Sequence, residues 1–168
     1  MIKLAIIGTG GQGIRLMGNI LAECIMSKSF EVSAMYDYDA AMRGGGIQGY
    51  IIFSKTKIIN PIIETADILL MLDKPKSKIN AKRVIMDESV DVPLAAEKMP
   101  FSKISEQMFS KKTMLNMVAL GFILKILGIG LDEKLISGIL PEKFLDENLA
   151  AIKAGYGLNK AESTDKNK

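Results

Sequence analysis

The first 25 residues constrain the fold most, because a glycine-rich loop stands between a short apolar run and a helical pattern. The apolar run covers residues 2–7, and the loop after it reads Gly8-Thr9-Gly10-Gly11-Gln12-Gly13. Glycine permits a positive φ and lets a ligand approach the bare main chain. The unpaired N–H groups of a first helical turn, with the positive end of the helix dipole, attract a phosphate or a carboxylate. This order of strand, loop and helix predicts either an anion site or a tight turn that packs strand against helix.

The glycine spacing also matches a nucleotide-binding pattern. Gly8, Gly10 and Gly13 fit the dinucleotide fingerprint. Asp37 follows a second β-like run, 31–36, about where a ribose-binding carboxylate is expected. One function open to the chain is therefore that of a free-standing NAD(P)-binding oxidoreductase. Against it, the chain is short, lacks a histidine base and has a predicted hairpin in place of a third βα unit.

Length and composition are those of one globular domain with a sizeable core. The chain has 168 residues, of which 48% are hydrophobic, and a net charge of +3. The lysines are scattered and aromatic residues are few, which argues against a nucleic-acid surface. The sequence shows neither a leader peptide nor an apolar run of about 20 residues, so we expect a cytoplasmic protein with no membrane contact.

Cysteine and histidine are nearly absent, which excludes several kinds of site. Cys24 is the one cysteine, and there is no histidine. A single cysteine excludes an internal disulfide and a self-contained cysteine-ligated iron–sulfur or zinc site. The lack of histidine excludes a Ser-His-Asp triad and an imidazole base or metal ligand. Because Cys24 falls among apolar residues of a predicted helix, we expect buried core filling rather than a reactive thiol.

The pattern along the chain predicts strands first and helices afterwards. A helix over 13–28 connects the opening strand to a strand at 30–36, and such a βαβ unit has a right-handed crossover and a parallel sheet start. Gly18 within this helix indicates close packing against the sheet. Further strands are expected at 47–53, 58–63, 66–72, 83–86 and within 100–105. The first two of these should form an inserted antiparallel hairpin, with a short helix or turn at 74–80 and irregular structure over 87–100.

The second half becomes helical from residue 112. Helices are expected at 114–127, 133–138 and 142–155, and Asp132 should cap the second of them. Asn116 is the main polar interruption of the first, which is apolar on most faces. We therefore predict a Rossmann-like three-layer α/β domain over residues 1–157, with a mixed, mainly parallel sheet, an inserted β-hairpin and a C-terminal helical segment. Residues 158–168 are polar and without periodicity, and we expect a disordered tail.

A second glycine-rich segment carries Arg43 directly before Gly44, Gly45 and Gly46. The residues allow two interpretations: an exposed loop with a solvated arginine, or an arginine held on flexible backbone to meet an anion or a neighbouring subunit. Both glycine-rich loops should lie at the carboxyl ends of parallel strands, where open α/β sheets bind ligands.

Together these segments resemble the gamma subunit, or gamma domain, of the 2-oxoacid:ferredoxin (acceptor) oxidoreductases, which act on pyruvate, 2-oxoisovalerate, 2-oxoglutarate or indolepyruvate. The resemblance covers about residues 3–155. It rests on the glycine loop with Ile20-Leu21-Ala22-Glu23, on Met42-Arg43-Gly44-Gly45, on 49–54, on Ile58-Ile59-Asn60-Pro61 and on 65–71. Relatives often have Tyr-Gly-x-Glu before the arginine, whereas here Tyr38 is followed by Asp39, Ala40 and Ala41.

The resemblance implies a subunit that is inactive alone and has no catalytic residue of its own. In this family thiamine diphosphate, Mg²⁺ and iron–sulfur clusters belong to the alpha, beta and ferredoxin-like delta subunits. The oxoacid, here 2-oxoglutarate or a branched-chain 2-oxoacid, is decarboxylated on thiamine diphosphate. Electrons then pass to ferredoxin, and coenzyme A (CoA) takes the acyl group.

For this chain we predict a binding site formed by the two loops. Its residues are Gly8, Gly10, Gly11, Gln12, Gly13, Arg43, Gly44 and Gly45. Their amides and the guanidinium would bind a CoA phosphate or contact the catalytic chain. The third function open to the chain is that of a pure assembly module whose glycine loop binds no small molecule. Titration with NAD and with CoA, and the identity of the proteins that co-purify, distinguish the three.

Overall fold

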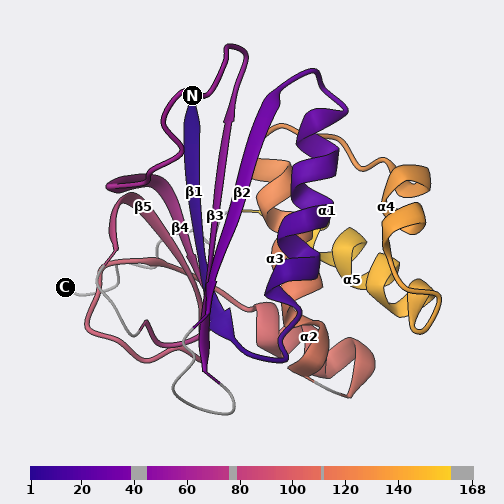
Figure 1. Cartoon of the computed structure of the whole chain (residues 1–168). Coiled ribbons are helices and arrows are strands. Elements are labelled where there is room, and N and C mark those ends of the chain that lie inside the picture. The colour runs from indigo at the N-terminus through magenta and orange to yellow at the C-terminus, as the bar shows by residue number, and fades with distance from the viewer. Residues whose placement is uncertain (39–44, 76–78, 111, 160–168) are drawn as a thin grey trace.

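The computed structural model describes residues 1–38, 45–75, 79–110 and 112–159, without the side chain of residue 112. The strands run, in chain order, over Ile2–Thr9 (β1), Glu31–Tyr38 (β2), Gly46–Ser54 (β3), Thr65–Met71 (β4), Asn80–Asp87 (β5) and Glu97–Met99 (β6). The helices are Ile14–Met26 (α1), Phe101–Phe109 (α2), Leu115–Ile126 (α3), Glu133–Ile139 (α4) and Leu145–Gly157 (α5), with a 3₁₀ turn at Lys112–Met114 before α3. The predicted α/β class is confirmed (Figure 1).

The sheet is mixed and mainly parallel, as expected. Its strand order is β2-β3-β1-β4-β5-β6. Strand β3 pairs antiparallel with both β1 and β2, whereas β1, β4, β5 and β6 pair parallel. Strands β1 and β2 therefore point the same way, as the βαβ interpretation requires, but β3 lies between them. The carboxyl ends of β1, β4 and β5 meet at one edge of the sheet.

The helices all lie on one face of the sheet, and irregular segments cover the other (Figure 1). The third layer is therefore made of loops rather than helices. On the helical face, the predicted stripe of α1 is buried and Cys24 is 1% exposed, which confirms its place in the core. Helix α3 is buried on most sides because it packs between α1, α2 and α5. No helix in the described ranges is long and apolar enough to cross a bilayer.

Packing within the first βα unit explains the glycine inside α1. A Cβ atom at Gly18 would overlap the hydroxyl of Tyr36 on β2. That hydroxyl donates to Asn19 Oδ1 at 3.0 Å. The predicted close approach of this helix to the sheet is confirmed.

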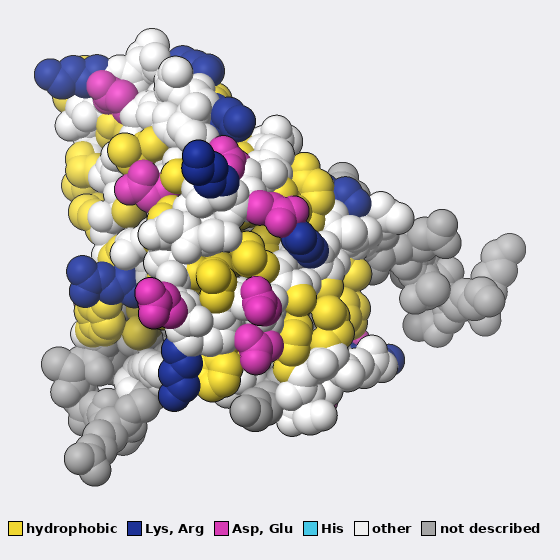
Figure 2. All heavy atoms as spheres, turned by 90° about the vertical axis from the view of Figure 1, so that its right-hand side faces the viewer, with side chains coloured by type: hydrophobic (Ala, Val, Ile, Leu, Met, Phe, Trp, Pro, Cys, Tyr) yellow, Lys and Arg dark blue, Asp and Glu magenta, His cyan; other side chains and the backbone are white. Residues whose placement is uncertain are grey.

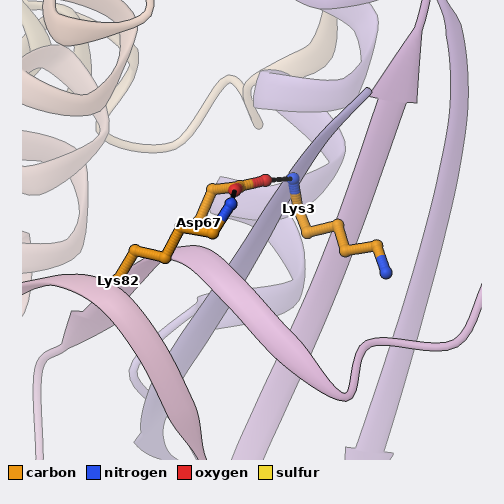
Figure 3. Close-up of polar contacts among 3 residues, drawn as sticks. All are labelled: Lys3, Asp67 and Lys82. Atoms are coloured by element: carbon orange, nitrogen blue, oxygen red, sulfur yellow. Dashed lines mark hydrogen bonds and ion pairs between the residues drawn. The ribbon is translucent and has the colours of Figure 1, made fainter.

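One carboxylate joins three strands at the end of the sheet opposite the glycine loop, near the N-terminus. Asp67 on β4 accepts the main-chain N–H of Lys3 at 2.8 Å and the ammonium of Lys82 at 2.7 Å (Figure 3). The pKa of Asp67 is lowered, chiefly by the hydrogen bond from Lys82 and against partial burial. The carboxylate thereby ties β1, β4 and β5 together where their parallel pairing begins.

The strand predicted at 58–63 does not form, and the hairpin predicted with it is wrong. The antiparallel partners of β3 are β1 and β2 instead. The segment is irregular because Pro61 has no N–H to donate and two other amides bond to side chains. Ile58 N donates to Glu31 Oε2 at 2.9 Å, and Ile62 N to Asn60 Oδ1 at 3.1 Å.

The strand predicted within 100–105 is also wrong, because helix α2 occupies these residues. Phe101, Ser102 and Ser105 are buried on one side of it, which is a helical spacing. The buried carboxylate of Asp87 accepts the Ser102 N–H at 2.8 Å and so satisfies one amide of the first turn. Strand β6, by contrast, is too short for its pattern to predict.

The remaining helices begin near their expected positions. Asp132 Oδ1 accepts the Leu135 N–H at 3.0 Å, so the predicted cap of α4 is confirmed. Helix α5 begins at Leu145 rather than at 142, because Phe144 has a positive φ of 63°. Of the predicted turn at 74–80, residues 76–78 lie outside the described residues, and so do residues 160–168 of the predicted tail.

Candidate anion-binding site at the glycine loop

The glycine loop is a tight turn closed by its own amide side chain. Thr9 N donates to Gln12 Oε1 at 2.8 Å, and Gln12 N donates to Thr9 O at 3.1 Å. Gly11 and Gly13 have φ angles of 90° and 69°, which side chains rarely adopt. The loop therefore packs β1 against α1. Its glycines also leave main chain without side chains just before α1.

The two glycine-rich loops meet at this edge of the sheet. Gly10 N donates to Gly45 O at 2.9 Å, and Gly8 lies opposite Ile47 at the end of the β1–β3 ladder. The expectation that both loops lie at carboxyl ends of parallel strands holds for Gly8 and Gly10 after β1, whereas Gly45 lies at the amino end of β3, which is antiparallel to β1. Arg43 and Gly44, which were also predicted as site residues, lie outside the described residues.

A cavity of about 330 Å³ opens beside the loop. It lies beyond the carboxyl ends of β1, β4 and β5 and before the starts of α2 and α3. Its lining residues are Gly11, Gln12, Leu72, Asp73, Lys74, Ser89, Val90, Ser102, Thr113 and Leu115. Clefts at this edge of open α/β sheets are where such folds bind ligands.

Sequence reasoning found the two loop residues of this lining but missed its hydroxyl groups and its lysine. Lys74 and Ser89 each follow a predicted strand, so their positions after strand ends could have indicated that they lie at the binding edge of the sheet. Ser102 and Thr113 gave no such signal, because 100–105 was predicted as a strand and the 3₁₀ turn was not predicted. The structure brings all four to one cavity.

Three helix N-termini border the cavity. Helices α1, α2 and α3 begin beside it, and none has an acidic residue in its first turn. Helices α4 and α5, which begin elsewhere, carry Glu133 and the pair Asp146 and Glu147 in theirs. No described side chain caps α1 or α3, and α3 continues directly from the 3₁₀ turn at Lys112–Met114. Lys74 and one carboxylate, Asp73, line the cavity, and a second carboxylate, Asp87, is buried behind its wall. Helix N-termini, hydroxyls and an ammonium group are the donors that an anion requires.

Asp87 fixes two of the serines that line the cavity. It is fully buried at the end of β5 and accepts the Ser89 N–H at 3.1 Å, the Ser89 hydroxyl and the Ser102 N–H. All of these bonds are to neighbouring protein groups. Asp87 therefore positions the wall of the cavity rather than facing a ligand.

Asn116 ties α3 to the glycine loop. It is 4% exposed, and its Nδ2 donates to Gly13 O at 3.4 Å across 103 positions of sequence. Its Oδ1 has no partner among the described residues. A buried amide with one long hydrogen bond costs stability relative to an apolar side chain, so this residue indicates a role at the loop.

The described residues do not provide a metal or cluster site. No group of three or more histidine, cysteine, aspartate or glutamate side chains gathers among them. The single cysteine lies in the core, where burial, aided by the negative charges of Asp132 and Glu23, raises its pKa to about 11. A thiolate ligand is not available there.

The strand order weakens the dinucleotide interpretation. In that interpretation the ribose-binding carboxylate stands on the strand next to β1. Here Asp37 pairs with Gln48 on β3, and Gln48 pairs with Ile7 on β1. Two strand spacings of about 4.8 Å therefore separate Asp37 from β1.

Comparison with known proteins decides the family. The family model for pyruvate ferredoxin/flavodoxin oxidoreductase matches residues 3–158. The chain belongs to this family. The predicted resemblance to this oxidoreductase family is thereby confirmed.

The chain is similar in sequence to subunits of two named enzymes. The 2-oxoglutarate synthase subunit KorC of Archaeoglobus fulgidus is 27% identical over 167 residues, which cover 95% of this chain and 88% of that protein. The ketoisovalerate oxidoreductase subunit VorA of Methanothermobacter thermautotrophicus is 25% identical over 92% of this chain and 35% of its own length. The family domain is thus nearly the whole of one relative and about a third of another.

Solved structures share the fold. The gamma subunit of a keto/oxoacid ferredoxin oxidoreductase from Geobacter sulfurreducens has a TM-score of 0.71 at 21% identity, covering 93% of this chain and 96% of that one. The 2-oxoglutarate:ferredoxin oxidoreductase of Magnetococcus marinus, solved with 2-oxoglutarate, coenzyme A and succinyl-CoA bound, has a TM-score of 0.75 at 22% identity. That match covers 96% of this chain and 32% of the other.

Proposed function

We propose that this gamma-type subunit completes the CoA site of a multi-subunit 2-oxoacid:ferredoxin oxidoreductase. The complex would convert 2-oxoglutarate or a branched-chain 2-oxoacid to its acyl-CoA, the two substrate classes in the names of its relatives. Thiamine diphosphate, Mg²⁺ and iron–sulfur clusters would reside on alpha, beta and delta partners, with ferredoxin as the electron acceptor. The complex would act in the cytoplasm.

The observation that carries the proposal is the cavity at the glycine loop. Three helices without first-turn acids begin beside it, and Lys74, Ser89 and Ser102 line it. Amides, hydroxyls and one ammonium are the donors that phosphate groups accept from. No group of three or more metal-ligating side chains gathers among the described residues. In this proposal the chain binds and positions CoA, and its partner subunits carry the reaction.

Arg43 is included in this proposal because Gly45, close to it in the sequence, contacts the glycine loop. Gly45, two residues later, bonds to Gly10 in the glycine loop. An arginine on this connection would supply a bidentate cation for a phosphate in the same neighbourhood. Gly8, Gly10, Gly11, Gln12, Gly13, Gly44 and Gly45 would supply the close main-chain approach.

The test is assembly followed by titration. The tagged chain should co-purify with a thiamine diphosphate-binding protein and a cysteine-rich protein, and the assembled complex should oxidise a 2-oxoacid only when CoA and an electron acceptor are present. Omission of this chain should remove CoA-dependent turnover. Oxidation of a metabolite by the isolated chain with soluble NAD would contradict the proposal, and so would full CoA-dependent activity of a complex that lacks the chain.

A further inference from the structure

Strand β2 forms a long, open edge of the sheet. It stands last in the strand order and pairs with β3 along all eight of its residues. None of its residues is buried, and no main-chain hydrogen bond joins it to a described segment other than β3 and its flanking turns. The opposite edge is β6, which has only three residues. The outer main-chain groups of β2 are therefore open to a further strand.

The sequence of β2 lacks the usual protection of such an edge. Natural edge strands often carry a lysine, a proline or a bulge that prevents pairing with another chain. Residues 31–38 contain neither lysine nor proline, and their register with β3 has no bulge. Met35 and Tyr38 on this strand are 41% and 50% exposed. The helical side of the molecule differs, because its apolar side chains lie among acidic and basic ones (Figure 2).

A groove of about 430 Å³ lies beside the start of β2. Its lining includes the first three residues of the strand, together with Met26, Phe30, Ile58 and Pro61. Successive residues of a strand point to opposite faces of the sheet. A space that all three of these strand residues line therefore lies at the edge of β2 rather than on one face. It suits an apolar side chain from an added strand.

We propose that β2 pairs antiparallel with β2 of a second copy of this chain, so that two six-stranded sheets become one. A two-fold axis perpendicular to the sheet relates the copies and keeps their helices on the same face. The even-numbered residues of β2 lie on that face, because Tyr36 contacts α1. The axis passes through Met35. Each Tyr38 then lies opposite Val32 of the other copy and fills the groove there.

The acidic residues of β2 favour this register over its symmetric neighbours. With the axis at Met35, the carboxylate of Asp37 lies opposite Ser33 of the other copy, whose hydroxyl donates to it. With the axis at Ala34, Glu31 would lie opposite Asp37, and like charges placed opposite each other destabilise a sheet. With the axis one residue after Met35, no β2 residue of the second copy would reach the groove.

Helix α1 adds opposite charges to the same edge. Its exposed residues recur at helical spacing and are Arg15, Asn19, Glu23 and Met26. This stripe lies on the β2 side of the helix, because Asn19 Oδ1 accepts the Tyr36 hydroxyl at 3.0 Å. The two-fold axis sets the two α1 helices antiparallel. Arg15 of one copy therefore approaches the end of α1 that carries Glu23 in the other, and the attraction occurs twice.

Disulfide trapping in the full chain tests the register. Met35→Cys places a thiol on the axis, where the paired Cα atoms of antiparallel strands lie about 4.5–5.5 Å apart, within disulfide range. Mild oxidation should give a covalent dimer of this variant. Ser33→Cys and Asp37→Cys should each crosslink only when the two variants are mixed. Met108→Cys, at a residue 48% exposed on α2, is the control and should not crosslink, and native Cys24 is only 1% exposed.

Sedimentation equilibrium tests the contact without a crosslink. Met35→Lys places two ammonium groups opposite each other on the axis, so Kd of the dimer should rise about tenfold or more. Tyr38→Ala, which empties the groove, should raise Kd about tenfold. Met108→Lys should leave Kd unchanged, and circular dichroism checks that each variant is folded.

Three results would overturn the proposal. The first is a wild-type chain that stays monomeric at every concentration. The second is a dimer that Met35→Lys does not weaken. The third is oxidation of Met35→Cys in the assembled complex that joins the chain to a different subunit, because that subunit would then cover β2.

Discussion

Gly155 on α5 lies directly against the main-chain carbonyl of Val118 on α3, so closely that a Cβ atom at position 155 would overlap that oxygen. The contact is reciprocal, because a Cβ at Gly121 on α3 would overlap the main chain of Ile152 on α5. The two helices therefore touch backbone to backbone. This contact fixes the position of α5 behind α3, whose first turn borders the anion cavity.

Alanine at either glycine should force the helices apart. We expect Gly155→Ala and Gly121→Ala each to lower the free energy of unfolding by about 1–3 kcal/mol, the usual cost of overpacking. Gly138 on α4 is the control, because nothing lies within 4 Å of a Cβ there. Gly138→Ala should raise stability by about 0.5–1 kcal/mol through helix propensity. Urea unfolding of the three variants measures the difference, and equal effects at positions 155 and 138 would contradict the contact.

Asp67 should make stability depend on pH at the acid side. Its folded pKa is lowered, first by the Lys82 hydrogen bond, so its contribution is complete above the unfolded value of about 4 and is lost as pH falls through the folded value. Asp67→Asn should cost about 1 kcal/mol at pH 7 and flatten the loss of stability below pH 4. Thermal unfolding between pH 7 and 3 measures both effects. Lys82→Gln, which keeps the Lys3 N–H bond, should show a smaller loss, and an unchanged acid slope in Asp67→Asn would refute the linkage.

Cys24 should be unreactive until the protein unfolds. Burial, followed by the charges of Asp132 and Glu23, raises its pKa to about 11, so at pH 8 only about one thiol in a thousand is ionised. The thiol is also 1% exposed. Labelling by a disulfide reagent should therefore be slow in buffer and become stoichiometric in urea, with a midpoint that follows unfolding. Rapid labelling of the native chain would show that this part of α1 opens locally.

The sequence was sufficient to predict the elements that are built from periodic, sizeable apolar patterns. The apolar residues of α1 recur at helical spacing, as burial of one face against a sheet requires. Helix α3 is apolar on most faces, as burial between other helices requires, so both could be predicted from the sequence. The segments that failed depend on tertiary contacts. The residues at 58–63 have β-forming side chains, but Pro61 and side-chain acceptors take their main-chain bonds. The start of α2 depends on Asp87, a partner that no local pattern reveals.

The candidate site was predictable only in part for the same reason. The glycine loop has a local signature, and its hydrogen bond to Gly45 agrees with the expected meeting of two strand ends. Ser102 lies in the first turn of α2 and Thr113 in the 3₁₀ turn before α3, and both line the cavity, so predicting them required the correct assignment of these two elements. The place of β3 between β1 and β2 likewise depends on long-range pairing, and it moved Asp37 away from the loop.

Arg43 should matter for CoA or for assembly if the proposal for this loop holds. Loss of one charged hydrogen bond costs about 1.5–3 kcal/mol. Arg43→Ala should therefore weaken CoA use or subunit assembly by roughly ten- to a hundred-fold. The measurements are KM for CoA in the reconstituted complex and co-elution with the partner chains. Arg43→Lys, which keeps the charge and loses the bidentate geometry, should recover part of the loss, and normal turnover of Arg43→Ala would remove Arg43 from the site.

Asn116 should hold the glycine loop in place at a cost to the stability of the fold. Its buried Oδ1 has no partner among the described residues and its Nδ2 holds Gly13 O at 3.4 Å, so Asn116→Leu should leave the free energy of unfolding unchanged or raise it by about 1 kcal/mol. The same change should loosen the start of α1 and raise KM for CoA severalfold. Met117→Leu, a volume-conserving change next to it in the core, is the control and should alter neither quantity by much. Unfolding curves and CoA titrations of the assembled complex measure the two effects separately. A large loss of stability with an unchanged KM would mean that Asn116 serves only the packing of α3.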